Sequence, residues 1–101
     1  MFLFIDTETT GLPINNIFDK KYIFKWPRLI QFSWIMYNKF GKLINSSNFY
    51  IKLNKNYNIS LSAFNIHGIN KKFLKKYGTN INKVLKKFFF FFKKSGYFNW
   101  S

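Results

Sequence analysis

The strongest chemical candidates in this sequence are Asp6 and Glu8, two carboxylates separated by one residue and placed directly after the apolar run Phe2 to Ile5. Alternate residues of a β-strand point to the same face of a sheet. Two carboxylates held together repel each other unless a cation lies between them, and Mg2+ or Mn2+ binds oxygen ligands of this kind. An isolated Asp-x-Glu sequence is more often the solvated end of a strand, so the surrounding sequence has to decide between the two interpretations.

The cysteine and histidine content excludes several other kinds of site. The sequence has no cysteine and one histidine, His67. It can therefore form neither disulfides nor the thiolate or multi-histidine sites that bind zinc. A metal bound by this chain would have to be a hard cation held by carboxylate oxygens.

The chain is strongly basic. Seventeen Lys and Arg against three Asp and Glu give a formal net charge of +14, which attracts polyanions such as nucleic acids. Lys, Asn, Phe, Ile and Tyr, whose codons are rich in A and T, make up more than half of the chain. Genome base composition explains the charge equally well, so the charge is weak support for nucleic-acid binding.

The carboxylates need a sheet to hold them, and the first half of the chain has the pattern of one. The run Phe2 to Ile5 is typical of a buried strand that ends just before Asp6. Residues 14–25 have no sustained period and are expected to form a loop. Two β-rich segments, Leu29 to Asn38 and Leu43 to Leu53, flank a turn and complete an antiparallel hairpin or meander with the first strand.

Helices are expected after residue 60. Ser60 to Ile66 and Lys71 to Tyr77 each fit one short helix, the second ended by Gly78. Thr79 or Asn80 could cap a third helix. The apolar stripe of that helix repeats at helical spacing and comprises Ile81, Val84, Leu85, Phe88 and Phe92.

Four segments, in the same order, match one family of nucleases. They are Phe-Ile-Asp-Thr-Glu-Thr-Thr-Gly-Leu at residues 4–12, Leu29-Ile30-Gln31-Phe32, Gly41-Lys42 and Ile66-His67-Gly68-Ile69. In these segments the chain resembles the DnaQ-like (DEDD) 3'-5' exonucleases, the family that includes the proofreading epsilon subunit of bacterial DNA polymerase III. The resemblance implies an α/β, ribonuclease H-like fold, truncated to its first three antiparallel strands and the helices that follow. Residues 1–94 would form the N-terminal part of an exonuclease domain.

The resemblance also implies roles for individual residues. Asp6 and Glu8 would bind the catalytic Mg2+ or Mn2+ ions, which in this family activate a water for attack on the terminal phosphodiester. The residues expected to hold the 3'-terminal nucleotide are Thr9, Gly11, Leu12, His67 and Gly68. His67 is not expected to be the general base, because the family's base histidine lies near the C-terminus of its domain.

Two further aspartates and that base belong to the family's pattern, and no residue of this sequence matches them. The third acidic residue, Asp19, falls in the expected loop. With half of the ligands of a two-metal site and no base, this chain on its own is expected to be inactive or nearly so.

The end of the sequence suggests a frameshift. The run Phe88 to Phe92, flanked by lysines, implies long tracts of T and A in the gene, where a polymerase can slip. When Gly96 to Ser101 is written in codons and read one base later, it can encode Val-Ile-Leu-Ile-Gly-His, a strand running into the family's second motif. The sequence therefore predicts that residues 95–101 are an out-of-frame tail.

The predicted function is metal-dependent release of nucleotides from the 3' ends of single-stranded DNA, with single-stranded nucleic acid and DNA polymerase subunits as partners. An RNA-trimming exonuclease of the same superfamily would share Asp6 and Glu8. A non-catalytic basic relic that binds nucleic acid and a decayed product without function are the alternatives. The first apolar run has no basic segment before it, and Phe88 to Phe92 is too short to span a bilayer, so we expect a cytoplasmic protein without a membrane partner.

Overall fold

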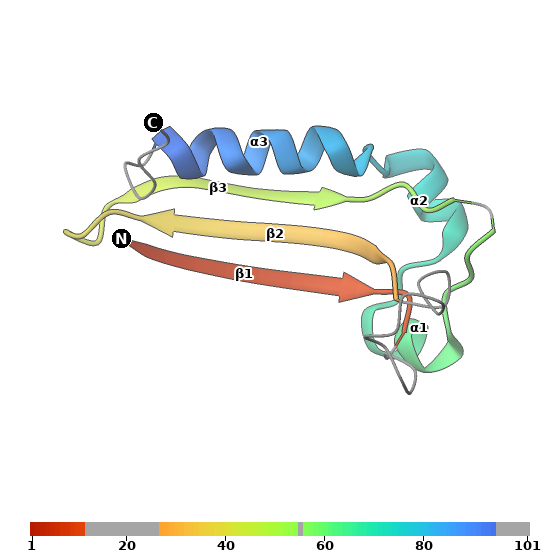
Figure 1. The fold of residues 1–101 in the computed structure, drawn as a ribbon. Helices are drawn as coiled ribbons and strands as arrows, with labels where there is room; N and C mark the ends of the chain where they lie inside the picture. The colour runs from red at the N-terminus through yellow and green to blue at the C-terminus, as the bar shows by residue number, and fades with distance from the viewer. Residues whose placement is uncertain (12–26, 55, 95–101) are drawn as a thin grey trace, which may run out of the picture.

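The computed structural model describes residues 1–11, 27–54 and 56–94, and within them three strands are followed by three helices (Figure 1). The elements are β1 (Phe2–Thr9), β2 (Leu29–Tyr37), β3 (Leu43–Tyr50), α1 (Leu61–His67), α2 (Lys71–Tyr77) and α3 (Ile81–Lys94). The strands form one antiparallel sheet in the order β1-β2-β3. This confirms the expected α/β class, with the three antiparallel strands and following helices of a ribonuclease H-like fold.

A tight turn sets the register of β2 against β3. The side-chain oxygen of Asn38 accepts hydrogen bonds from the backbone N–H groups of Phe40 and Lys42, at 2.9 and 3.0 Å. Gly41 has a φ of 79°, a left-handed conformation that glycine adopts without steric cost. The expected hairpin is therefore present, and the strand expected to reach Leu53 ends at Tyr50.

The prediction for the first strand was wrong in two respects. β1 continues to Thr9, so Asp6 and Glu8 lie within the strand and not beyond its end. The strand is also not buried, because Phe2, Phe4 and Ile5 are 57%, 60% and 50% exposed. Pairing with β2 extends the strand through the polar residues. Phe2 and Phe4 are exposed because they share the face of Asp6 and Glu8, which α3 does not cover. Within the described residues β1 also pairs with β2 alone, which leaves one edge open.

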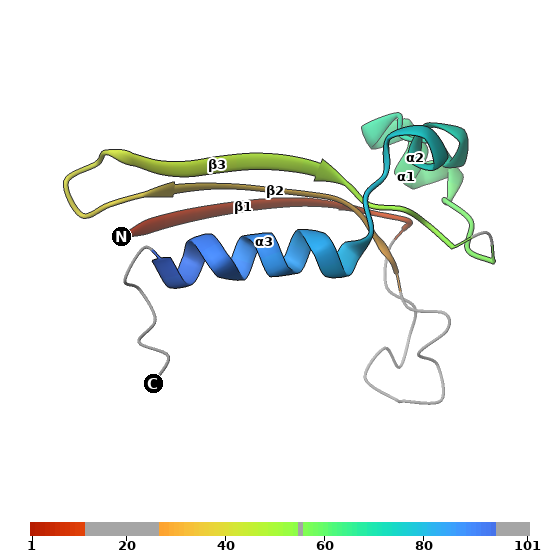
Figure 2. The same ribbon diagram turned by 90° about the horizontal axis from the view of Figure 1, so that it is seen from above.

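Helix α3 runs lengthwise along one face of the sheet (Figure 2). Its buried stripe is Val84, Phe88 and Phe92, which packs on a row of buried β2 side chains, Phe32, Trp34 and Met36. Asn80 caps the helix by accepting a hydrogen bond from the backbone N–H of Asn82 at 2.8 Å. In the described part of the chain, no helix is long and apolar enough to cross a membrane.

A second, smaller core joins α2 to the sheet. Its buried residues are Ile30 of β2, Ile69 and Leu74. Two residues after α2, the backbone N–H of Thr79 donates to the carbonyl of Tyr50 at 2.8 Å. The carbonyl of Thr79 accepts from the backbone N–H of Lys52 at 3.0 Å. A Cβ on Gly78 would lie 2.8 Å from the Lys52 nitrogen, so this close approach requires glycine.

Candidate active site

Asp6 and Glu8 point to the face of the sheet opposite α3. Leu3, three residues before Asp6 and therefore on the other face of the strand, packs in the core beneath α3. Asp6 lies opposite Ser33 in the ladder, and Glu8 lies opposite Gln31. Asp6 is exposed and Glu8 is half-buried, and no described residue forms a hydrogen bond or ion pair with either carboxylate. Both are available as ligands for a cation.

A β-bulge interrupts the ladder between β1 and β2 directly after Glu8. Glu8 pairs with Gln31 but Thr9 pairs with Leu29, so Ile30 has no partner on β1. Bulges of this kind re-aim neighbouring side chains and often stand beside functional sites. Beyond the bulge, the backbone N–H of Thr10 donates to the carbonyl of Arg28 at 2.9 Å, and the Thr10 hydroxyl accepts from the N–H of Arg28 at 2.9 Å. These bonds fix the direction in which the chain leaves the sheet.

Helix α1 is fastened to this end of β1. The backbone N–H of Ser60 donates to the carbonyl of Thr10 at 2.8 Å. The hydroxyl of Ser60 caps α1 by accepting from the N–H of Ala63 at 3.1 Å. A Cβ on Gly11 would lie 3.1 Å from that hydroxyl oxygen. Glycine at position 11 therefore lets the strand end and the helix approach closely.

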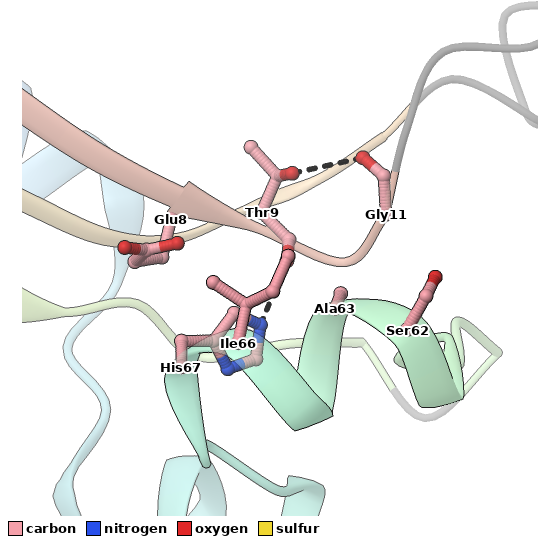
Figure 3. Close-up of a pocket in the computed structure, with 7 residues that line it drawn as sticks. All are labelled: Glu8, Thr9, Gly11, Ser62, Ala63, Ile66 and His67. Atoms are coloured by element: carbon pink, nitrogen blue, oxygen red, sulfur yellow. Dashed lines mark hydrogen bonds between the residues drawn. The ribbon is translucent and has the colours of Figure 1, made fainter.

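His67 provides the second fastening, at the other end of α1 (Figure 3). Its Nδ1 accepts a hydrogen bond from the backbone N–H of Ile69 at 3.0 Å, which leaves the proton of the neutral ring on Nε2. Nε2 lies 3.1 Å from the carbonyl oxygen of Thr9 and donates to it. Because both ring nitrogens are engaged, His67 braces the helix against the strand and has no nitrogen left to accept a proton from a substrate.

Between the strand end and the helix lies a cavity of about 220 Å³. Its lining comes from the two elements just described and consists of Glu8, Thr9, Gly11, Ser62, Ala63, Ile66 and His67 (Figure 3). The helix contributes a largely apolar wall that includes Ala63 and Ile66, and β1 contributes Glu8 and Thr9. Asp6 lies further back along β1, in a shallow hollow that also includes Phe4 and Ser33. The arrangement suits a ligand with an apolar part against α1 and an anionic part near a metal held by the carboxylates.

The structure brings together four of the expected site residues and separates others. Glu8, Thr9, Gly11 and His67 line one cavity. Gly68 does not line it: with a φ of 69° it ends α1, and its N–H donates to the carbonyl of Phe64 at 2.7 Å. Leu12 lies outside the described residues.

Sequence reasoning missed the helix wall of the cavity. Ser62, Ala63 and Ile66 lie five, four and one residues before His67 on α1, so Ala63 is one helical turn from His67 and three residues from Ile66. Residues three and four apart on a helix are neighbours on its surface. The spacing from His67 was the available signal, but the position of α1 against β1 depends on contacts that are distant in the sequence.

The carboxylates fit a hard cation, although they do not form a complete cage. Within residues 1–11, 27–54 and 56–94, no group of three or more His, Cys, Asp or Glu side chains comes together. Mg2+ is commonly held by one or two carboxylates and keeps several waters. Asp6 and Glu8, on one face of β1 and without other partners in the described chain, are sufficient for that mode of binding.

Comparisons with known proteins identify the family of the chain. No curated protein gave a significant match to the chain. The family model for exonucleases matches residues 3–98, which span nearly all of the sheet and helices and both sides of the cavity. The chain therefore belongs to the exonuclease family.

Proposed function

We propose that this chain binds the 3'-terminal nucleotide of single-stranded DNA in the cavity between β1 and α1, as part of a metal-dependent 3'-5' exonuclease resembling the proofreading epsilon subunit. The observation that carries the proposal is that Glu8, one of two carboxylates without a partner among the described residues, lines the same cavity as the apolar wall of α1. Asp6 and Glu8 are the proposed ligands of Mg2+ or Mn2+. The apolar side chain of Ile66 is the proposed contact for the sugar and base.

Each residue of the site has a limited task in this proposal. A bound metal would supply Lewis-acid polarisation of the phosphodiester and an activated water. Asp6 and Glu8 hold that metal beside the cavity. His67 keeps α1 at a fixed separation from β1 through its bond to the carbonyl of Thr9, and it takes no part in proton transfer. Position and charge, rather than a nucleophilic side chain, are what these residues contribute.

The supply of carboxylates limits turnover. A two-metal site needs more ligands than Asp6 and Glu8, and the third acidic residue of the sequence, Asp19, lies outside the described residues. We therefore expect the 101-residue chain to bind metal and nucleotide but to hydrolyse DNA slowly or not at all. The same shortage favours a second candidate, a basic relic that binds nucleic acid without a metal.

The proposal extends to partners and location. Single-stranded DNA with a free 3' end is the proposed substrate, and RNA is its competitor, because discrimination of the 2'-hydroxyl depends on details of the pocket. DNA polymerase subunits are the proposed protein partners, by resemblance to proofreading enzymes. A chain that acts with a polymerase on intracellular DNA would work in the cytoplasm.

Binding of Mn2+, followed by electron paramagnetic resonance, tests the proposal. The free-ion signal should fall on addition of wild-type protein. It should remain with Asp6→Asn and Glu8→Gln, since each change removes one ligand. Asp19→Asn is the matched control, because it alters the net charge by the same amount as Asp6→Asn. If the Asp19 and Asp6 variants weaken Mn2+ binding equally, Asp6 is not a specific ligand and the non-catalytic relic is the better account.

A further inference from the structure

A groove of about 610 Å³ lies between α2 and the segment that follows β3, away from the candidate active site. Four of its seven lining residues are lysines: Lys52, Lys71, Lys72 and Lys75, beside Leu53, Asn54 and Leu74. Lys71 and Lys75 are one helical turn apart on α2, and Lys52 faces them from the strand side. The groove is therefore a concave, cationic surface built by two separate parts of the chain.

No acidic side chain is among the described residues that line this groove. The described residues contain two carboxylate side chains, Asp6 and Glu8, and both belong to β1. Like charges one helical turn apart destabilise a helix. Lys72 and Lys75 lie three residues apart on α2, and an anion with several negative charges would relieve their repulsion.

The backbone beneath the lysines is held firmly. Leu74 is 1% exposed, in the small core under α2. The ring of Phe73 packs edge-on against Tyr50, with centroids 4.7 Å apart. The backbone N–H of Lys52 donates to the carbonyl of Thr79 at 3.0 Å. The relative position of the two sides of the groove is thus set by packing and by hydrogen bonds, not by the lysine side chains themselves.

The groove and the candidate active site lie at the same end of the molecule. β1 and β3 both point toward this end, and α1 and α2 are gathered beyond it (Figure 1). A single strand whose last nucleotide enters the cavity beside Glu8 can therefore continue toward α2. The turn between β2 and β3 and the last residues of α3 lie at the opposite end.

We propose that this lysine groove binds backbone phosphates of the single strand whose 3' end occupies the cavity, an inference that rests on the proposed function. Lysine ammonium groups bind phosphates as point charges and without reading base edges. The groove would hold the strand in a sequence-independent way during successive encounters with the 3' end. Its affinity should fall with salt, since each neutralised phosphate releases counterions.

Covalently closed circular single-stranded DNA separates this proposal from the function of the cavity, because a circle has no 3' end to enter it. Binding is followed by fluorescence anisotropy of a labelled circle, without divalent metal. The test variant replaces three exposed groove lysines with glutamine: Lys52, Lys72 and Lys75. The control variant replaces three exposed lysines at the opposite end of the molecule with glutamine: Lys39, Lys42 and Lys93. Both variants lose the same charge.

The test variant should bind the circle at least about tenfold more weakly than the control at low salt. Each phosphate contact on a single strand contributes about 0.7 to the slope of log K against log salt, so loss of three contacts should reduce that slope by about 2. Because the circle has no 3' end and no divalent metal is present, a failed metal site leaves this test valid. Equal losses of DNA binding in the two lysine variants would overturn the proposal. It would also be overturned if the test variant kept its DNA binding and lost only the binding of polyglutamate, an anionic polymer without phosphates. Circular dichroism of both variants checks that they are folded.

Discussion

Replacing Phe88 with alanine should detach much of α3 from the sheet. The Phe88 side chain is 7% exposed, and its ring centroid lies 5.3 Å from those of both Phe32 and Trp34. An aromatic side chain buries about 150–250 Å², which at about 25 cal/mol per Å² amounts to about 4–6 kcal/mol as an upper bound. Observed losses for such changes in protein cores are about 3–5 kcal/mol. We expect a loss in that range, a large part of the total stability of a small domain.

Phe90→Ala is the matched control, because it makes the same chemical change two residues further along the same helix. Phe90 is 56% exposed, so its loss should cost less than about 1 kcal/mol. Urea unfolding followed by tryptophan fluorescence measures both variants, since Trp34 lies in the core beneath α3. Equal losses for Phe88→Ala and Phe90→Ala would refute the assignment of the buried face of α3.

Three further changes test other parts of the structure. His67→Ala removes two partly buried hydrogen bonds and should cost about 1–3 kcal/mol by urea unfolding; an unchanged midpoint would mean that the ring does not brace α1. Gly78→Ala would place a methyl group 2.8 Å from the backbone nitrogen of Lys52, so thermal unfolding should show a loss of about 1–3 kcal/mol, and a stable variant would contradict the close contact. Phe4 is 60% exposed on the edge strand β1 and should promote self-association. Phe4→Lys should reduce this self-association in light scattering; unchanged association would mean that another surface is responsible.

The helices were predictable because their signals are local. The expected bounds of α2, Lys71 to Tyr77, agree with the structure. Its cap, Asn70, accepts from the N–H of Phe73 at 2.8 Å. α1 begins one residue after the expected start because Ser60 is its cap and not its first residue. In each case the capping residue directly precedes the helix in the sequence.

β1 was harder to predict because its length depends on its partner. The polar residues from Asp6 to Thr9 continue the strand only because β2 lies alongside them. The bulge at Ile30 has no turn residue to signal it. An apolar run such as Phe2 to Ile5 has the same pattern whether one or both faces of the sheet are covered, so the run did not show that Phe4 would be exposed.

For the candidate site, the motif residues were predictable and the opposite wall was not. Glu8 and Thr9 follow directly from the motif, whereas Ala63 and Ile66 reach the cavity through the docking of α1 on β1. The role expected of Leu12 and the out-of-frame tail expected at residues 95–101 lie outside the described residues, and both stay predictions.

Nucleotide binding in the cavity is the central claim, and a calorimetric titration with thymidine 5'-monophosphate tests it most directly. Binding should be at least about tenfold tighter with Mn2+ than without it, which corresponds to about 1.4 kcal/mol. Ala63→Trp, which fills the cavity, should abolish binding, whereas Leu61→Trp, 74% exposed in the wild type and outside the cavity lining, should not. Retained binding by the folded Ala63 variant, or binding that ignores Mn2+, would contradict the account.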